Sequence, residues 1–281
     1  MLKQRIATAL VLLAILLPAL FYPAPAPFFV VMLAVVGAAG WEWGRLHAYG
    51  PRWAVFLGVE CVALCVLTWA LGLLAQPLPL LWSLVGAGWV LGGAALLRAG
   101  VPGWGKVPRF VRISGGVFAL WAAWLAICQA RIAGINFLLS VLLLVWAADV
   151  FAYFAGRAFG LRFSRHRLAP AISPGKSWEG VWGGMFGVLV LALVWVWADA
   201  SADAEAASLY TLLAERGWWM LLLGVLFLTA MSVVGDLIES LIKRASGVKD
   251  SSGLLPGHGG VLDRIDALLP TVPLALMLVS W

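Results

Sequence analysis

Composition places this chain among membrane proteins. It has 281 residues, of which 63% are hydrophobic and only 11% charged, and its mean hydropathy is +1.00. These values exclude an ordinary soluble domain. The net charge of +6 does not indicate a nucleic-acid partner, because the basic residues lie between apolar runs, where they set topology and meet anionic head groups. The sequence predicts an all-α, polytopic integral membrane protein that binds no nucleic acid.

Nine apolar runs predict about nine transmembrane helices, because runs of roughly 20 residues match the thickness of a bilayer core. The first run has the basic start of a secretory signal, but the many later runs favour an uncleaved helix. The last run is short and contains Pro270 and Pro273. The expected spans are 6–22, 28–46, 53–74, 80–97, 115–130, 137–153, 181–198, 218–244 and 267–281.

The polar residues divide the chain into two regions. Residues 1–134 hold the first five spans and a segment, 98–113, in which basic residues alternate with apolar ones, as in helices that lie on an anionic membrane surface. Residues 135–281 hold the last four spans and two polar loops, 157–180 and 245–266. We expect the chemistry in this second region.

The basic residues also predict an orientation. With the N-terminus in the cytoplasm, every Lys and Arg except Arg131 and Arg216 falls in an inner segment. This distribution agrees with the positive-inside rule. Nine spans then place the C-terminus outside and both polar loops in the cytoplasm.

The end of the eighth span carries several polar side chains on one stripe. Asp236, Ser240 and Lys243 fall within about 60° of one another on a helix, and Arg244 is one step further round. A solvated helix end would have a similar composition. However, Asp236 follows directly from an apolar run, so we expect it at membrane depth, where ionisable residues are usually functional.

A glycine-rich loop follows this span. It contains Lys249 and Asp250, and it ends in a PGHGG segment with His258, Gly259 and Gly260. Glycines let backbone N–H groups approach a phosphate, and a lysine neutralises it. The loop does not have the GxxxxGK[ST] spacing of a Walker A motif, and a mobile connector is the alternative interpretation.

Two carboxylates lie at the end of the loop. Asp263 and Asp266 are three residues apart and share one face if a helix begins here. Carboxylates at this spacing suit Mg²⁺, although acidic residues also stabilise the N-terminus of a helix. Asp236, from the preceding span, supplies a third carboxylate and favours the metal site.

A second polar cluster surrounds the loop after the sixth span. Asp149 lies near the end of an apolar run, and a basic RFSRHR segment and the sequence ISPGKSWEG follow. The basic segment is equally consistent with a purely topological role. A Pro-Gly turn that presents Lys176 between Ser173 and Ser177 is typical of a phosphate contact.

These residues resemble the motif of the phosphatidate cytidylyltransferases, which are also called CDP-diacylglycerol synthases. The segments 149–156 and 173–180 are similar to the same family less specifically, so the detailed match covers roughly the second half of the chain. The motif spans 27 residues, and its parts are Ser240-Leu-Ile-Lys243-Arg244, Lys249-Asp250, Pro256-Gly-His258-Gly-Gly and Asp263-Arg264-Ile-Asp266.

The resemblance implies that CTP and phosphatidic acid react to give CDP-diacylglycerol and pyrophosphate. It implies Mg²⁺ or Mn²⁺ on Asp236 and Asp263, with Asp266 close by and a second cation left open. The implied catalytic residues are Lys243, Arg244, Asp263 and Asp266. The implied substrate-binding residues are Asp149, Ser173, Lys176, Ser240, Lys249, Asp250, His258, Gly259, Gly260 and Arg264.

The resemblance also implies a homodimer in the bacterial inner (plasma) membrane, with the active site facing the cytoplasm. Two alternatives remain. A CTP-dependent polyprenol kinase would transfer the γ-phosphate to an alcohol. An ion-coupled transporter would place charges at the centre of its spans and would show internal repeats, whereas the charges here gather near one face.

Overall fold

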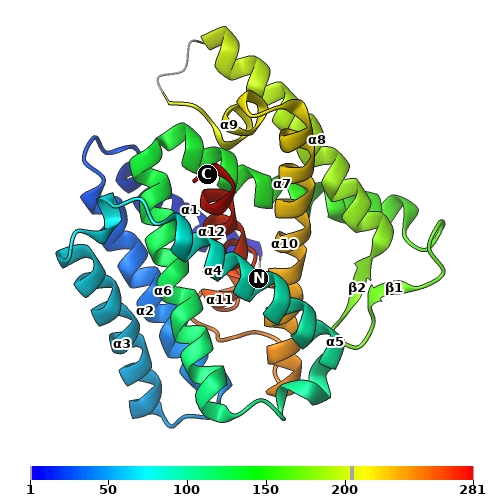
Figure 1. Ribbon diagram of the computed structural model, residues 1–281. Coiled ribbons are helices and arrows are strands. Elements are labelled where there is room, and N and C mark those ends of the chain that lie inside the picture. The colour runs from blue at the N-terminus through cyan, green and yellow to red at the C-terminus, as the bar shows by residue number, and fades with distance from the viewer. Residues whose placement is uncertain (1, 203–205, 281) are drawn as a thin grey trace.

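The computed structural model describes residues 2–202 and 206–280 and is built almost entirely from helices (Figure 1). The helices are α1 (Leu2–Phe21), α2 (Ala26–Leu46), α3 (Pro51–Ala70), α4 (Pro79–Ala87), α5 (Gly93–Trp104), α6 (Arg109–Ala133), α7 (Ile135–Phe159), α8 (Trp178–Ala202), α9 (Leu209–Glu215), α10 (Trp218–Ala245), α11 (Leu262–Ile265) and α12 (Leu268–Val279). A 3₁₀ turn, Leu73–Ala75, and a π-helical segment, Gly88–Gly92, interrupt them. Two short strands, β1 (Arg167–Ala169) and β2 (Ser173–Ser177), pair antiparallel.

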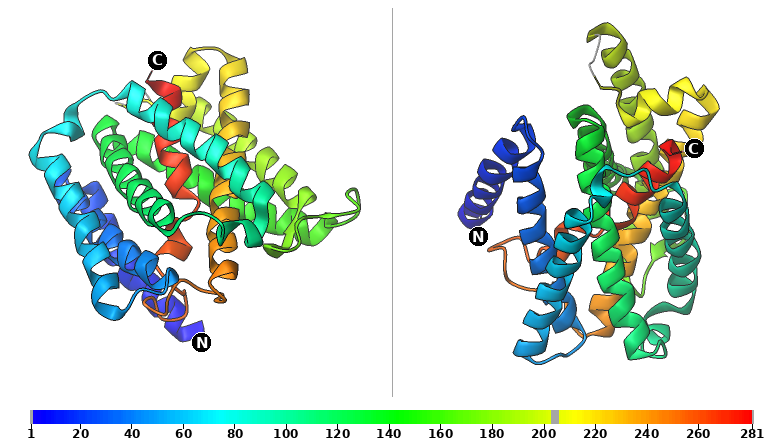
Figure 2. Two further views of the ribbon diagram at one scale, coloured as in Figure 1. Left: turned by 60° about the horizontal axis from the view of Figure 1, so that its bottom comes forward. Right: turned by 60° about the vertical axis from the view of Figure 1, so that its left-hand side comes forward.

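Within this described part of the chain, eight helices are long and apolar enough to cross a membrane. This confirms the polytopic all-α class. The expected ninth span corresponds to α12, which has 12 residues and a length of about 18 Å. That is shorter than a bilayer core of roughly 30 Å. Helix α12 packs against α4, α6 and α10, and Figure 2 shows it among the other helices of the bundle.

Close helix pairs build the bundle. Helices α2 and α3 approach so tightly that a Cβ on Gly58 would lie 2.6 Å from the backbone oxygen of Gly37. Helices α7 and α8 do the same, since a Cβ on Gly184 would lie 2.9 Å from the oxygen of Ala148. Small residues at such crossings are how membrane helices pack without a hydrophobic driving force.

The segment 98–113 differs from the expected surface helix. Helix α4, the π-helical segment and α5 together form one candidate span, Pro79–Trp104. Gly100 breaks its regularity with φ 66° and ψ −170°, a conformation that suits glycine. After a short turn, α6 begins at Arg109 and continues as the next span. The basic residues therefore occupy the ends of two crossing helices and the turn between them.

The polar segments gather at one end of the bundle. Figure 1 shows the loop 246–261 and the turn 105–108 at the lower end, with the β-hairpin on the lower right. Helix α9 lies at the opposite, upper end. The two polar loops expected on one side of the membrane are thus on the same side of the molecule.

Candidate functional site

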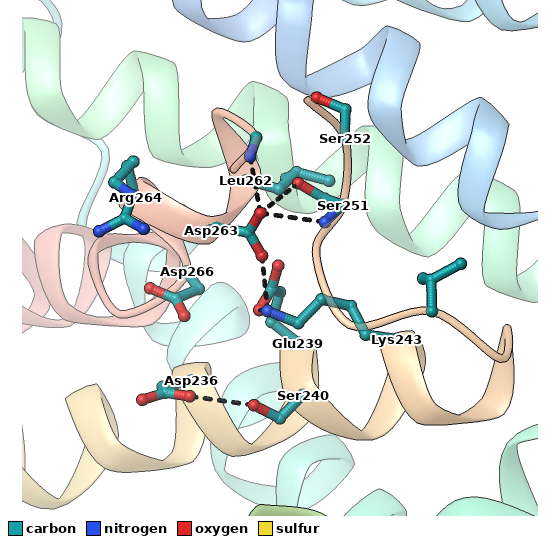
Figure 3. Close-up of polar contacts among 12 residues, drawn as sticks. Asp236, Glu239, Ser240, Lys243, Ser251, Ser252, Leu262, Asp263, Arg264 and Asp266 are labelled. Atoms are coloured by element: carbon teal, nitrogen blue, oxygen red, sulfur yellow. Dashed lines mark hydrogen bonds and ion pairs between the residues drawn. The ribbon is translucent and has the colours of Figure 1, made fainter. Parts of the chain in front are cut away.

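A buried ion-pair network links α10 to α11. The ammonium of Lys243 lies 2.6 Å from Oδ1 of Asp263 and also pairs with Glu239, one turn back on α10. The three side chains are only 12%, 7% and 8% exposed, respectively. Figure 3 shows Lys243 between the two carboxylates. Lys243 and Asp263, which are 20 positions apart in the sequence, are therefore in direct contact. Glu239, which the sequence analysis did not select, is the second acid of the network.

The second oxygen of Asp263 organises the glycine-rich loop. Oδ2 accepts hydrogen bonds from the backbone N–H of Ser251 (3.0 Å), from its hydroxyl (2.9 Å) and from the N–H of Gly260 (2.7 Å). Burial raises the pKa of Asp263, but the hydrogen bonds, that from Lys243 foremost, outweigh burial and lower this pKa to about 2. Four protein donors thus occupy the carboxylate of Asp263, which is 7% exposed, whereas Asp236 has two donors and is 30% exposed. A metal ion would have to displace some of these donors to bind Asp263.

The geometry of the loop follows from this carboxylate. Gly259 has φ 83°, and a Cβ there would lie 2.8 Å from Oδ2 of Asp263. The N–H of Gly260, which the sequence analysis assigned to a phosphate, is instead bonded to Asp263. The carbonyl of His258 accepts hydrogen bonds from Arg264 Nε (3.0 Å) and Nη2 (2.5 Å). The loop is therefore wrapped around Asp263 by its own residues.

A second charge pair lies on the neighbouring face of α10. Nζ of Lys176, on β2, is 2.6 Å from Oδ2 of Asp236, and the two side chains are 25% and 30% exposed. The hydroxyl of Ser240 donates to Oδ1 of Asp236 at 3.2 Å. The structure therefore brings Lys176, from the first polar loop, against the polar end of α10. However, Lys176 and Ser173 lie on a strand, where the sequence analysis expected a turn.

Asp266 and Asp149 are close enough to Asp236 for their charges to interact with it. Figure 3 shows the carboxylates of Asp236 and Asp266 directed into the same space. Burial raises the pKa of Asp266, and the nearby carboxylates of Asp236 and Asp149 raise it further. A cation among these oxygens would relieve their repulsion, so this donor set suits a divalent metal ion better than Asp263 does. As placed, no three His, Cys, Asp or Glu side chains of the described residues form a metal cluster.

Glu42 is a central residue that the sequence analysis missed. It lies fully buried near the end of α2. Its carboxylate accepts hydrogen bonds from the hydroxyl of Ser252 (2.5 Å) and the backbone N–H groups of Val261 (2.9 Å) and Leu262 (2.7 Å). A charged residue inside an expected span was the available signal.

Glu179 holds the other polar loop in the same way. Its Oε1 accepts hydrogen bonds from the backbone N–H groups of Phe163 (3.1 Å) and Ser164 (2.7 Å) and from the Ser164 hydroxyl (2.8 Å). Glu179 is 4% exposed. Two buried glutamates, one for each loop, thus position the segments that carry the charged groups.

The remaining predicted residues lie at the rim of the site. Arg244 is exposed, and its Nε lies 3.4 Å from the backbone oxygen of Ile172 at the β-hairpin. Lys249 and Asp250 are also exposed, at the start of the loop. Arg264 is exposed beside His258. Their position leaves them accessible to a ligand that approaches from outside the bundle.

The fold and the site together define a polytopic membrane protein with paired acidic and basic groups inside one end of its helical bundle. The profile of the cytidylyltransferase family matches residues 3–281. A phosphatidate cytidylyltransferase of Pseudomonas aeruginosa is 45% identical over 97% of this chain and 95% of its own length. One of Haemophilus influenzae is 38% identical over 97% and 96%. The chain belongs to the cytidylyltransferase family.

Proposed function

We propose that the protein is a phosphatidate cytidylyltransferase that converts CTP and phosphatidic acid into CDP-diacylglycerol and pyrophosphate. One observation carries the proposal: Lys176 and Lys243 meet Asp236 and Asp263 at one end of the bundle, in a chain 45% identical to an enzyme of that name. Such a site joins a soluble, highly charged nucleotide to a lipid whose acyl chains stay in the bilayer.

In this reaction a phosphate oxygen of the lipid attacks the α-phosphorus of CTP. A new P–O bond forms, the bond to the bridging oxygen breaks, and pyrophosphate leaves with its electron pair. Because both reactants are anionic, catalysis depends on positioning and on neutralising charge. Lys176 and Lys243 supply this positive charge inside the site. Arg244, Lys249 and Arg264 supply it at the rim, where they contact the phosphates of CTP or the lipid.

Asp236 and Asp266, with Asp149 beside them, would hold Mg²⁺ or Mn²⁺ with the phosphates of the nucleotide. The ion supplies charge neutralisation at the phosphoryl oxygens. Asp263 has a different role in this proposal. It fixes Lys243 and the glycine-rich loop in place through the hydrogen bonds described above.

The enzyme lies in the bacterial inner membrane with this site facing the cytoplasm, where CTP is available. The concentration of basic residues at this end of the bundle supports that orientation. We further propose that it functions as a homodimer, as the family resemblance implies. Cross-linking in native membranes tests this last point directly.

The test uses purified protein in detergent with phosphatidic acid, Mg²⁺ and CTP labelled at the α-phosphate. We expect label in a chloroform-soluble product, and we expect the Asp236→Asn variant to lose it. Glu215→Gln is the matched control, since Glu215 is exposed on α9 at the other end of the bundle. Label that reaches a polyprenol from γ-labelled CTP, with none from α-labelled CTP, would replace the proposal by a kinase.

A further inference from the structure

Two adjoining cavities lie beside the site on the side of α5 and α6. One, of about 600 Å³, is polar and lies between the end of α2, the end of α10 and the following loop. The other, of about 530 Å³, lies between the π-helical segment, α5, α6 and α10 and is lined almost entirely by apolar residues. Leu46, Trp104 and Arg112 line both cavities. Volumes of this size are typical of small-ligand sites.

The polar cavity contains two buried nitrogen atoms without a partner in the described part of the chain. His47 is 8% exposed, and its Nδ1 donates to the backbone oxygen of Trp43 at 2.8 Å. Within the described residues, its Nε2 and the Nε of Arg112 have no hydrogen-bond partner. Unsatisfied buried polar atoms are costly and are rare in folded proteins. Arg45 adds a second guanidinium to the lining, against one acid, Asp250, so the cavity favours an anion.

Three glycines in the lining of the apolar cavity leave free space beside their backbone. A Cβ built at Gly88, Gly92 or Gly115 would meet no atom of the described structure within 4 Å. Gly88 and Gly92 bound the π-helical segment, and such segments are frequent at functional sites. Trp89, Leu96 and similar side chains complete the lining. The surface suits a flexible hydrocarbon chain.

Both cavities border the ion-pair network of the catalytic site. Glu239, which pairs with Lys243, lines the apolar cavity. Ser251, which donates to Asp263, lines the polar cavity. On α10, the residues that line the apolar cavity are centred roughly 100° from the stripe of Asp236, Ser240 and Lys243. Glu239 is at the edge of the lining nearest to that stripe. The cavities are therefore next to the reacting groups and not remote from them.

We propose that these two cavities form the lipid acceptor site, in which the phosphate of phosphatidic acid contacts the guanidinium groups of Arg112 and Arg45 and one acyl chain fills the apolar cavity. The proposal rests on the proposed function. It assigns the lipid to the α5–α6 side of α10 and leaves the Lys176–Asp236 side to the nucleotide. Two features favour this lipid. The two guanidinium groups complement the charge of a phosphate monoester, and the polar cavity that holds them adjoins the apolar cavity.

Photo-cross-linking locates the lipid without relying on activity. Wild-type protein in nanodiscs is irradiated with phosphatidic acid that carries a diazirine in one acyl chain, and the labelled peptides are mapped by mass spectrometry. We expect labels within residues 84–96 and 107–120, competed by unlabelled phosphatidic acid. Labels confined to the lipid-facing surface of α1 or α8, with none in these segments, would overturn the proposal.

Cavity filling provides the second test. Gly92 has φ −65° and ψ −43°, which any residue adopts, so Gly92→Leu fills the cavity without backbone strain. We expect the apparent KM for phosphatidic acid to rise about tenfold, the equivalent of two methylenes kept out of the cavity, with the KM for CTP unchanged. Leu91→Phe is the matched control, because Leu91 is 71% exposed and lies outside the lining.

Arg112→Gln tests the head-group contact. We expect it to raise the KM for phosphatidic acid and to weaken the cross-link, while Arg98→Gln, an exposed arginine of α5, leaves both unchanged. Normal lipid KM values in both Gly92→Leu and Arg112→Gln, together with wild-type turnover, would overturn this inference alone. A wild-type protein that makes no lipid product would instead overturn the proposed function, and the cross-linking result would still stand.

Discussion

The carboxylate of Glu42 accepts a hydrogen bond of 2.7 Å from the backbone N–H of Leu262, a residue 220 positions further along the chain. Glu42 is fully buried, and the same carboxylate also binds Val261 and Ser252. The second helix of the chain therefore fixes the start of α11. Since Asp263 is the next residue, this contact determines where the Lys243 pair forms.

Glu42→Gln is expected to weaken both stability and activity. Glutamine has one acceptor oxygen in place of two, and its amide turns a donor toward the backbone donors of α11. Leaving a buried N–H unsatisfied costs about 2 kcal/mol in the free energy of unfolding. Thermal unfolding in detergent, followed by tryptophan fluorescence, measures the loss. Glu60→Gln on α3 is the matched control; an equal loss there would contradict the prediction.

Much of the fold was predictable because the bilayer imposes a simple rule. Runs of apolar residues identified the eight long helices, and the spacing of basic residues predicted that the polar loops share one end. The expected span 267–281 corresponds to a helix of only 12 residues, α12. An apolar run of this kind is equally suited to a short helix buried among α4, α6 and α10. Hydropathy does not distinguish burial in protein from burial in lipid.

The site was predictable where its residues are close in sequence. The motif brought Lys243, Asp263 and Asp266 into one region, and the structure places Lys243 against Asp263. The role of Asp263 was harder to predict, because its partners, Ser251 and Gly260, are loop residues whose backbone N–H groups carry no sequence signal. Long-range contacts such as that of Glu42 likewise depend on packing.

Gly259→Ala is expected to destabilise the glycine-rich loop. Gly259 has φ 83°, and its Cβ would also lie 2.8 Å from the Asp263 carboxylate. The left-handed conformation alone costs a non-glycine residue about 1–2 kcal/mol. Gly247→Ala is the control for that cost, because Gly247 has φ 72° and a Cβ there meets no described atom within 4 Å. We expect Gly259→Ala to lower the unfolding temperature and kcat more than Gly247→Ala; equal effects would exclude a contribution from the contact with Asp263.

Lys243→Met and Asp263→Asn are expected to have non-additive effects on stability. The double variant should lose less free energy of unfolding than the sum of the losses in the two single variants. Removing the ammonium leaves Glu239 and Asp263 as buried carboxylates without their partner. Breaking a buried pair from one side typically costs about 3–5 kcal/mol. A double-mutant cycle on unfolding free energies measures the coupling, with Lys106→Met as an exposed control. Strictly additive effects would show that the pair does not stabilise the fold.

We expect the protein to lose stability in mild acid because of His47. Burial lowers the pKa of His47 from its ordinary 6.5, and the charges of Arg112 and Arg109 lower it further, against a raising effect of the bond to Trp43. As the pH falls below 6.5, the unfolded chain binds a proton that the folded protein excludes, so the contribution of His47 to stability declines. Unfolding temperatures between pH 8 and pH 5.5 should fall more steeply for wild type than for His47→Gln. If the unfolding temperatures of wild type and His47→Gln changed in parallel with pH, the lowered pKa of His47 would be contradicted.

Removal of single carboxylates should separate metal binding from loop positioning. If Asp236 and Asp266 hold the divalent ion, Asp236→Asn and Asp266→Asn should each weaken Mn²⁺ binding at least about tenfold, measured by electron paramagnetic resonance on the purified protein. Asp263→Asn should reduce stability and kcat but leave Mn²⁺ affinity nearly unchanged, because four protein donors already occupy the buried Asp263 carboxylate. Adding a chelator should abolish turnover in the wild type, and Mg²⁺ should restore it. Loss of Mn²⁺ binding in Asp263→Asn, with a normal unfolding temperature, would return Asp263 to the metal site that the sequence alone predicted.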